Sequence, residues 1–468
     1  MVVPVSASLA QAVDAPKGTQ PNLLFIYGEG HRADALSAAG HPILKTPNHD
    51  RIGNEGVRFE NAFCTNALCA PARSTVLTGM YSKSTGALGN NDLDKPLPTP
   101  YFTDMLREAG YEIALVGKAH CRDGAKDRNW DYYFGFNAPA TNYYEPQFFE
   151  GHGLEMGPEK TYYGYADDIA LEKALAWLQK PRDKPFCLLF WPQTPHAPYY
   201  RARRHLDLYN GVVIPKPSTF DDDLKGWPGR SKAVVEAKNK IGTHVNPDAT
   251  RSLEELVKDY YAGLVAVDEM IGKLFAYLEK SGELDNTAIL HSSDHGYFLG
   301  EFRMFDKRLM YEPSIRVPMM LRYPKTIRAG SVRKEMVLDI DIAPTLLEIA
   351  GIKPRKEMQG KSMVKLANAG DPSWRKEWLY DYYEYPGYED VRPHRGIRTV
   401  THKLIHFYTV DEWEMYDIAN DPDEKNNLYM SPAHAGKKTE LILALTRLFE
   451  ATPQLPGGPT SVHPSISF

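Results

Sequence analysis

Residues 68–79 read Leu-Cys-Ala-Pro-Ala-Arg-Ser-Thr-Val-Leu-Thr-Gly, a run in which a cysteine directly precedes a helix-forming segment. The proline two residues after Cys69 is typical of the first turn of a helix, so the pattern predicts that Cys69 lies at a helix N-terminus. The helix dipole at that position favours a thiolate or a bound anion. Spacing alone leaves two interpretations of Cys69 open, an activated nucleophile and a buried structural cysteine.

Around this stretch, short apolar runs alternate with helical segments. The runs at 22–27, 111–116, 186–191 and 287–292 are typical of buried strands, and the segments 103–109, 165–178 and 253–278 are typical of helices. This alternation predicts an α/β fold with a mostly parallel sheet flanked by helices on both faces.

Polar residues come directly after each of the four predicted strands. In chain order they are Glu29 and His31, Lys118 and His120, His196, and Asp294 and His295. Ligands of parallel sheets bind beyond the carboxyl ends of the strands. We therefore expect these residues to lie near a ligand site at one edge of the sheet.

The C-terminal part of the chain has a different pattern. Short strands with turns are predicted at 378–383, 396–400, 403–407 and 413–418, and a helix at 437–450, which suits a smaller antiparallel sheet with one helix. Residues 200–252 have weak periodicity and are interpreted as a surface insertion. We expect a leader at 1–20, a main domain at 21–370 and a C-terminal subdomain at 371–468.

Composition excludes several classes of protein. With 55 Lys and Arg against 60 Asp and Glu among 468 residues, the net charge is −5 and no basic stripe indicates nucleic-acid binding. The longest apolar runs fall far short of the roughly 20 residues that a membrane span needs. Four cysteines are too few for a disulfide scaffold in a chain this long, and none forms a C-x-x-C pair, which argues against a structural zinc site.

The first fifteen residues are small and apolar and contain an Ala-x-Ala-like step at 10–12, but they lack the Lys or Arg of a signal peptide. A trimmed export signal and an uninformative leader both fit this composition. The first interpretation predicts a periplasmic or secreted protein.

The motif Cys-x-Pro-x-Arg followed by Leu-Thr-Gly resembles the active-site signature of type I sulfatases. Further similar segments span nearly the whole chain: 21–22, 46–48, 56–59, 117–120, 195–198, 293–296, 414–417 and 421–428. The resemblance implies an alkaline-phosphatase-like α/β fold whose catalytic domain is 21–370. It is strongest to carbohydrate sulfatases such as the N-acetylglucosamine-6-sulfatases and iduronate-2-sulfatases.

In that family a maturation enzyme oxidises the motif cysteine, here Cys69, to formylglycine. The resemblance implies that the formylglycine hydrate is the nucleophile. One hydroxyl attacks sulfur and expels the alcohol, which leaves a covalent sulfo-enzyme, and the second hydroxyl then eliminates sulfate.

A sulfate ester is an anion, so its site needs cations and hydrogen-bond donors. By resemblance, Arg73 holds the formylglycine hydrate, and Lys118 and Lys307 bind sulfate oxygens. His120 lies near the diol and helps release sulfate, and His196 protonates or stabilises the leaving alcohol. Outside such motifs, a lone lysine is usually a solvated surface charge and a lone histidine an ordinary hydrogen-bonding group.

The predicted metal site departs from the family pattern. Relatives have two adjacent aspartates after the first strand, and these bind Ca²⁺ together with the later motif and a formylglycine oxygen. Here Glu29 and Gly30 occupy those positions, so the implied ligands are Glu29, Asp294, His295 and the formylglycine made from Cys69.

Ca²⁺ takes about 6–8 oxygen ligands, so a site with one carboxylate fewer should bind it less tightly. His31 is a further candidate, although imidazole favours Zn²⁺. Four interpretations stay open: a weakened Ca²⁺ site, another divalent ion, catalysis by the cations alone, and loss of metal and activity.

Two segments of the C-terminal subdomain, 382–386 and 393–396, resemble parts of carbohydrate sulfatases. His394 and Arg395 are therefore expected to contact sugar hydroxyls or a second anionic group of a sulfated carbohydrate. Two alternatives to a sulfatase are a phosphonate or phosphate ester hydrolase of the same superfamily and a catalytically silent protein that binds sulfated ligands. The sugar, the sulfate position and the oligomeric state stay open.

Overall fold

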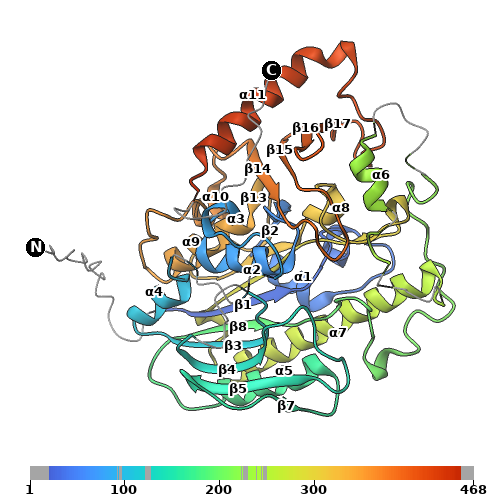
Figure 1. Ribbon diagram of the computed structural model, residues 1–468. Coiled ribbons are helices and arrows are strands. Elements are labelled where there is room, and N and C mark those ends of the chain that lie inside the picture. Colours follow the sequence, from blue (N-terminus) through green and yellow to red (C-terminus); the bar gives the residue numbers. More distant parts are fainter. Residues whose placement is uncertain are drawn as a thin grey trace, which may run out of the picture.

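The computed structural model describes residues 20–454 except 92, 94–96, 98, 122–127, 223, 225–229, 239, 244 and 246–249. Its largest element is an 11-stranded sheet with the strand order β13-β2-β12-β9-β1-β8-β3-β4-β5-β6, in which β7 pairs with β5 (Figure 1). Its strands are β1 (Asn22–Gly28), β2 (Val57–Phe63), β3 (Glu112–Lys118), β4 (Trp130–Phe136), β5 (Gln147–Gly153), β6 (Glu155–Met156), β7 (Lys160–Thr161), β8 (Phe186–Trp191), β9 (Thr287–Ser293), β12 (Met319–Arg322) and β13 (Ser331–Leu338).

The centre of this sheet is parallel. Strands β9, β1, β8, β3 and β4 pair in parallel, and antiparallel pairs occur toward the edges. The register places Gly28 beside Ser293 and Gly117 beside Trp191, so the carboxyl ends of the four central strands meet at one edge of the sheet. The prediction of a mostly parallel sheet is confirmed.

Helices cover both faces because successive side chains of a strand point to opposite sides. Leu23, Phe25 and Tyr27 of β1 belong to one core with α2, α4 and α9, and Leu24 and Ile26 belong to a second core with α1, α5 and α7. Figure 1 shows α2 and α7 on opposite sides of β1. The helices are α1 (Pro47–Asn54), α2 (Cys69–Thr78), α3 (Ser82–Thr85), α4 (Phe102–Glu108), α5 (Ala166–Leu178), α6 (Lys232–Lys238), α7 (Leu253–Lys280), α8 (Glu312–Ile315), α9 (Ile342–Ile349), α10 (Val364–Ala369) and α11 (Ala435–Ala451).

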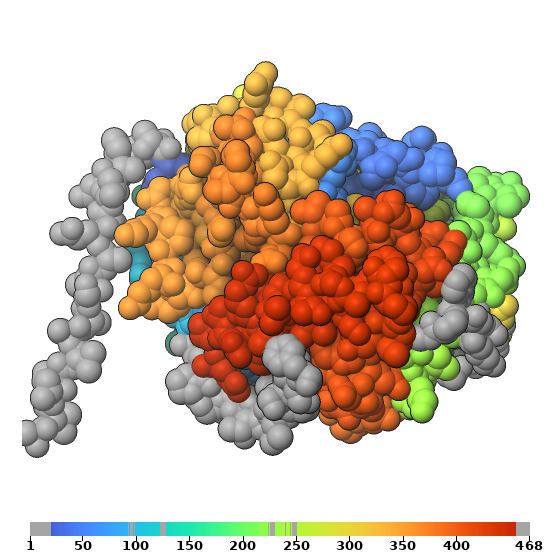
Figure 2. Space-filling model, turned by 90° about the horizontal axis from the view of Figure 1, so that it is seen from above, coloured from blue at the N-terminus to red at the C-terminus, as the bar shows by residue number. Residues whose placement is uncertain are grey.

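A four-stranded antiparallel sheet forms the C-terminal part, as predicted. Its strands are β14 (Glu377–Tyr382), β15 (His394–Thr399), β16 (His402–Phe407) and β17 (Glu412–Asp417), and a short ribbon of β10 (Phe298–Leu299) and β11 (Phe305–Asp306) precedes it in the chain. Helix α11 packs on the small sheet through Leu441 and Leu445. Figure 2 shows these C-terminal residues, in orange and red, gathered on one face of the molecule.

The interpretation of residues 200–252 as a surface insertion is only partly correct. Helix α6 buries Ala233, Val234 and Ala237 in the same core as the sheet. A helix of two turns carries too few apolar positions to show a period in the sequence, which is why the pattern looked weak there.

Among the helices that the structure describes, none combines the length and apolar character required to cross a membrane. Residues 1–19 of the predicted leader lie outside the described part. The four cysteines are buried free thiols.

Candidate active site

The loops after β1 and β9 are tied together at the edge of the sheet. The Asp294 amide donates to Gly28 O at 3.3 Å, and the Gly30 amide donates to the Asp294 carboxylate at 3.0 Å. The Ser293 hydroxyl accepts from the His31 amide at 2.8 Å. These hydrogen bonds hold Glu29 and Asp294 side by side.

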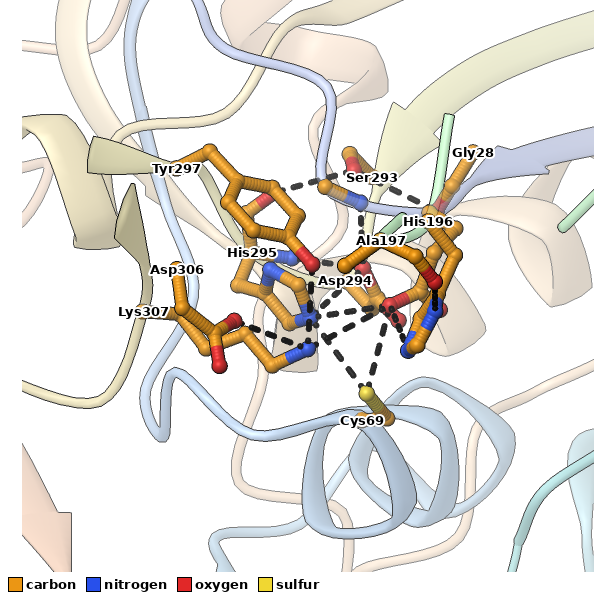
Figure 3. A network of polar contacts seen from close by, with 12 residues as sticks. Gly28, Cys69, His196, Ala197, Ser293, Asp294, His295, Tyr297, Asp306 and Lys307 are labelled. Atoms are coloured by element: carbon orange, nitrogen blue, oxygen red, sulfur yellow. Dashed lines mark hydrogen bonds and ion pairs between the residues drawn. The ribbon is translucent and has the colours of Figure 1, made fainter. Parts of the chain in front are cut away.

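Cys69 is the first residue of α2, which ends at Gly79 in the left-handed conformation with φ 68°. The predicted place of Cys69 at a helix N-terminus is thus confirmed. Its sulfur lies 3.3 Å from Glu29 Oε1 and 3.5 Å from His295 Nε2. In Figure 3 the thiol rises from the helix end toward the Lys307 ammonium and the loop after β9.

The Glu29 carboxylate is the centre of the site and is fully buried. Its Oε2 accepts from Lys118 Nζ at 2.6 Å and from Arg73 Nη2 at 2.9 Å. Its Oε1 lies 3.6 Å from Lys307 Nζ and 3.9 Å from His196 Nε2. One carboxylate therefore lies among three permanent cations, and an anionic substrate requires cations of this kind at its site.

Arg73 links the two carboxylates of the site. Its Nη2 also donates to Asp294 Oδ2 at 3.1 Å, and its Nη1 donates to the Lys118 carbonyl at 2.8 Å. The guanidinium carbon stands 5.5 Å from the centre of the Tyr27 ring and 5.4 Å from that of Trp191. Packing and hydrogen bonds thus hold Arg73 in one position.

This arrangement shifts the pKa values of the site. Burial and Glu29 oppose ionisation of Cys69, but Lys118 and Lys307 together hold the pKa of the thiol well below its usual range. Burial also opposes ionisation of Glu29, whose pKa the same cations and His295 nonetheless hold well below its usual range. Burial and the neighbouring Glu29 raise the pKa of Asp294 to about 7.

Two more predicted residues, His120 and His196, complete the arrangement. Burial lowers the pKa of His120 to about 4, although the neighbouring Cys69 thiol acts in the opposite direction. His196 Nδ1 donates to Ala197 O at 2.7 Å, which leaves Nε2 free to face Glu29. The His196 side chain is 13% exposed, whereas those of Glu29 and Asp294 are fully buried, so solvent reaches the site at His196.

The four predicted metal ligands come together. One possible ligand atom from each of Glu29, Cys69, Asp294 and His295 lies within 4.8 Å of all the others, and the Cys69 sulfur marks the position from which a formylglycine oxygen would reach the group. Carboxylate oxygens suit a hard divalent cation, which usually takes about 6–8 ligands when it is Ca²⁺. These residues therefore fit a divalent cation. However, Arg73 already binds one oxygen each of Glu29 and Asp294, so the remaining oxygens supply an incomplete set of protein ligands.

The place of the missing second carboxylate is filled by Tyr297. A Cβ atom on Gly30 would lie 2.0 Å from Cε2 of the Tyr297 ring, and Gly30 has φ +66°. The tyrosine hydroxyl stands 3.5 Å from Lys307 Nζ, and Lys307 Nζ also lies 3.3 Å from Asp306 Oδ1. Sequence reasoning missed Tyr297 and Asp306, although each stands within two residues of a predicted site residue.

Three predicted residues lie outside this group. The His31 ring joins His49 and His291 and not the Glu29 cluster, so the expectation that His31 approaches the catalytic ion is wrong. His394 is fully buried and stacks on Tyr380 and Tyr382.

Arg395 is 3% exposed and lies over the rings of Tyr408 and Phe449. Neither His394 nor Arg395 reaches solvent as the side chains stand. Contact of these two residues with a sugar stays a prediction that their burial disfavours.

Comparison with known proteins gives the same family as the sequence motif around Cys69. A family model described as Sulfatase matches residues 21–352, and one described as N-sulphoglucosamine sulphohydrolase, C-terminal, matches residues 300–451. An N-acetylglucosamine-6-O-sulfatase of Bacteroides thetaiotaomicron is 36% identical over an alignment covering 95% of this chain and 89% of that protein.

Solved structures agree. One described as a complex with its substrate D-glucosamine-2-N,6-O-disulfate has a TM-score of 0.82 at 34% identity, covering 92% of this chain and 98% of that chain. The phosphonate monoester hydrolase of Agrobacterium radiobacter shares the fold, with a TM-score of 0.73 at 20% identity, covering 93% of this chain and 96% of its own. This chain therefore belongs to the sulfatase family, the sulfuric ester hydrolases of alkaline-phosphatase-like fold.

Proposed function

We propose that the protein hydrolyses a sulfate ester on a carbohydrate, with 6-O-sulfated glucosamine as the substrate class. The relatives support the sugar, because both the 36% identical sulfatase and the substrate complex carry this group in their descriptions. The observation that carries the chemistry is Cys69 at a helix N-terminus, facing a buried cluster that contains the three cations Arg73, Lys118 and Lys307.

The proposed nucleophile is the hydrate of formylglycine made from Cys69 by a maturation enzyme. One hydroxyl oxygen bonds to sulfur while the bond from sulfur to the alcohol oxygen breaks, which gives a covalent sulfo-enzyme. The second hydroxyl then loses its proton, the aldehyde re-forms, and sulfate leaves. Addition of water to the aldehyde restores the hydrate.

The residues of this chain have separate tasks in that sequence. Lys118 and Lys307 would bind sulfate oxygens and stabilise the charge that develops in the transition state. His196 lies where solvent enters, so it would protonate the departing alcohol. Burial and Lys118 lower the pKa of His196, and the negative charge of a bound sulfate would raise it again. His120 is kept neutral by burial and lies beside Cys69, so it would take the proton from the second hydroxyl.

Glu29, Asp294 and His295 would hold a divalent cation, for which we propose Ca²⁺, and that ion supplies positive charge beside the sulfate when bound. We further propose that residues 21–370 form the catalytic domain and 371–468 the C-terminal subdomain. Export to the periplasm or medium stays a prediction.

Turnover of a matched set of esters tests the proposal. The matured protein should release sulfate from N-acetylglucosamine 6-sulfate faster than it releases phosphorus products from a phosphate or a phosphonate monoester. Cys69→Ala should lower kcat/KM by a factor on the order of 10³ or more, because the nucleophile is lost. Cys64→Ala is the matched control, since Cys64 is equally buried but its thiol contacts the Ser314 carbonyl outside the cluster.

Dominant phosphorus activity would show that the protein is a phosphonate or phosphate ester hydrolase. Binding of the sulfated sugar without turnover would favour the silent homologue, provided that Cys69 is converted. Mass spectrometry of the tryptic peptide 59–73 checks this, because Cys69 should appear as the aldehyde while Cys64 in the same peptide stays a thiol.

A further inference from the structure

Three buried histidines lie together beneath the active-site loops. His31 comes from the loop after β1, His49 from α1 and His291 from β9, and all three are 0% exposed. One ring nitrogen of each lies within 4.8 Å of one from both others. The ring centres of His49 and His291 are 4.7 Å apart, and those of His31 and His291 are 5.6 Å apart.

Four ring nitrogens of these three histidines have no partner among the described residues. Among the described residues, His31 Nδ1, His49 Nε2 and both ring nitrogens of His291 are buried without a hydrogen bond. A buried polar atom without a partner costs free energy, and four in one place call for a common explanation.

The opposite nitrogens of two rings are held by acceptors. His31 Nε2 donates to Thr194 O at 3.2 Å, and His49 Nδ1 donates to Asp268 Oδ1 at 2.7 Å. Since a carbonyl and a carboxylate oxygen can only accept, each of these nitrogens carries the proton. In the neutral form of either ring, the lone pair would therefore lie on the unpartnered nitrogen, His31 Nδ1 or His49 Nε2.

Asp268 is itself fixed by its surroundings. It lies on α7 and also accepts from the Asn48 amide at 3.0 Å, from the Asn48 side chain at 2.9 Å and from the His49 amide at 2.8 Å. A carboxylate that orients a histidine through its second nitrogen is the usual outer partner of a metal-bound imidazole. Asp268 is such an outer partner for His49.

We propose that His31, His49 and His291 bind a transition-metal ion of the Zn²⁺ class at a site separate from the catalytic cluster. Three imidazole ligands suit Zn²⁺ and not Ca²⁺, which prefers oxygen. Zn–N bonds of about 2.0–2.1 Å in a tetrahedral site put the nitrogens roughly 3.4 Å apart, so the rings would close in on the ion from their present spacing within 4.8 Å. The absence of a cysteine zinc motif does not bear on a site made of histidines.

The ion would have a positioning role. It would join the loop that carries Glu29 to α1 and to β9, because His31 follows Glu29 by two residues and its amide donates to Ser293. The site is closed to solvent, so it would take up metal as the chain folds.

Metal content tests the proposal directly. The full-length protein is dialysed against Zn²⁺ and Ca²⁺, passed through a weak chelator and analysed by plasma mass spectrometry. We expect the unmutated protein to keep one Zn²⁺ per chain, and His49→Gln and His291→Leu to lose it. His394→Gln, an equally buried histidine outside the cluster, should keep it.

Two further variants separate this site from the catalytic one. Glu29→Gln and Asp294→Asn should retain the Zn²⁺. Loss of zinc from these two variants with retention in the His49 and His291 variants would overturn the proposal, as would an unmutated protein without zinc.

Two measurements on the unmutated protein do not depend on whether a variant folds. Adding Zn²⁺ to the metal-free chain should raise Tm by several degrees, because an ion that binds only the folded state stabilises it. Substituting Co²⁺ should give visible absorption bands of a Co²⁺ ion bound by imidazole nitrogens. If Tm does not change and no such bands form, the proposal is wrong.

Discussion

Glu29 and Gly30 are the residues in which this site differs from the usual pair of aspartates. The longer Glu29 side chain reaches Lys118, Arg73 and Cys69 at once. Gly30 contributes only its amide, which donates to Asp294, and the Tyr297 ring fills the space beside it. The glycine at position 30 and the tyrosine at position 297 therefore depend on each other, because a side chain at position 30 would occupy the space of the Tyr297 ring.

Substitution of Gly30 by alanine should destabilise the protein through both backbone and packing. Gly30 has φ +66° and its new Cβ would meet the Tyr297 ring at 2.0 Å, whereas Gly40 has φ +85° and open space around it. Gly40→Ala should cost about 1–2 kcal/mol of unfolding free energy, the penalty of the left-handed conformation. Gly30→Ala should cost about 1–3 kcal/mol more, because the ring must move.

Denaturant unfolding of the two variants measures this difference. Adding Tyr297→Ala to Gly30→Ala should recover part of the extra cost. Equal losses of unfolding free energy for Gly30→Ala and Gly40→Ala would show that the new Cβ at position 30 does not collide with the Tyr297 ring.

Asp339 should make stability fall as pH rises. Its carboxylate is fully buried, and burial raises its pKa from 3.8 to about 7 although Thr65 and Ile340 donate to it. Because the raised value belongs to the folded state, the native protein keeps a proton that the unfolded chain loses between about pH 4 and 7. The stabilisation of the folded protein by this proton is complete below pH 4 and is lost as pH rises to 7. It amounts to at most about 4 kcal/mol.

Unfolding free energies at pH 5 and pH 8 check the sign. Asp339→Asn has no proton to lose, so its stability should fall less over this interval than that of the unmutated protein. The exposed Asp183→Asn variant is the control and should keep the full pH dependence. Identical slopes for all three proteins would show that Asp339 does not titrate there.

At the scale of elements, α7 is the helix that supports the loop bearing Glu29. Tyr260 on α7 donates its hydroxyl to Gly30 O at 2.6 Å and accepts from the Arg32 amide at 3.0 Å. About two turns further along the helix, Asp268 orients His49. The helix spans 28 residues, so it aligns these contacts along one rigid rod.

The N-terminus of α7 is fixed by a capping box. Ser252 Oγ accepts from the Glu255 amide at 3.2 Å, and the Glu255 carboxylate accepts from the Ser252 amide at 2.6 Å. Ser252→Ala should cost about 1 kcal/mol of unfolding free energy and lower Tm, because two helix-end amides are satisfied by this pair. Ser281→Ala, at the other end of the helix, should stay within about 0.5 kcal/mol. Thermal melts of both variants test this, and equal shifts would exclude a special role for the cap.

At the scale of the whole molecule, the large and the small sheet share one core. Trp378, Tyr380 and Phe407 of the small sheet belong to the same apolar cluster as Phe63 and Leu77. A buried ion pair also crosses between them, because Lys403 Nζ of β16 lies 3.0 Å from Glu312 of α8. The predicted boundary at 370 therefore divides two sheets but not two cores.

A chain that stops at residue 370 should not fold on its own. Removing 371–468 would expose the apolar face under β14 and β16 and leave Glu312 without Lys403 and Arg398, and an unpaired buried charge costs about 3–5 kcal/mol. In the full-length protein, far-ultraviolet circular dichroism and tryptophan fluorescence should report one common unfolding transition. A well-folded fragment, or two separated transitions, would instead support two independent domains.

The sequence by itself determined the parallel sheet, the helix that begins at Cys69, the small C-terminal sheet and the identity of the residues around Glu29. These features depend on periodicity, on the polar residues that follow each strand, and on a long motif, all of which are local in the chain. Parallel strands then bring their carboxyl ends to one edge, so local position was enough to predict proximity.

Only the tertiary structure decided where individual side chains point. The Tyr297 ring over Gly30, the burial of His394 among aromatic rings, and the meeting of His31 with His49 and His291 depend on packing between residues far apart in the chain. Spacing along a strand or helix predicts a face, but the contacts of a side chain are set by which elements pack against that face. For this reason the sequence pointed to His31 as a ligand of the catalytic ion, and the fold placed it in a different cluster.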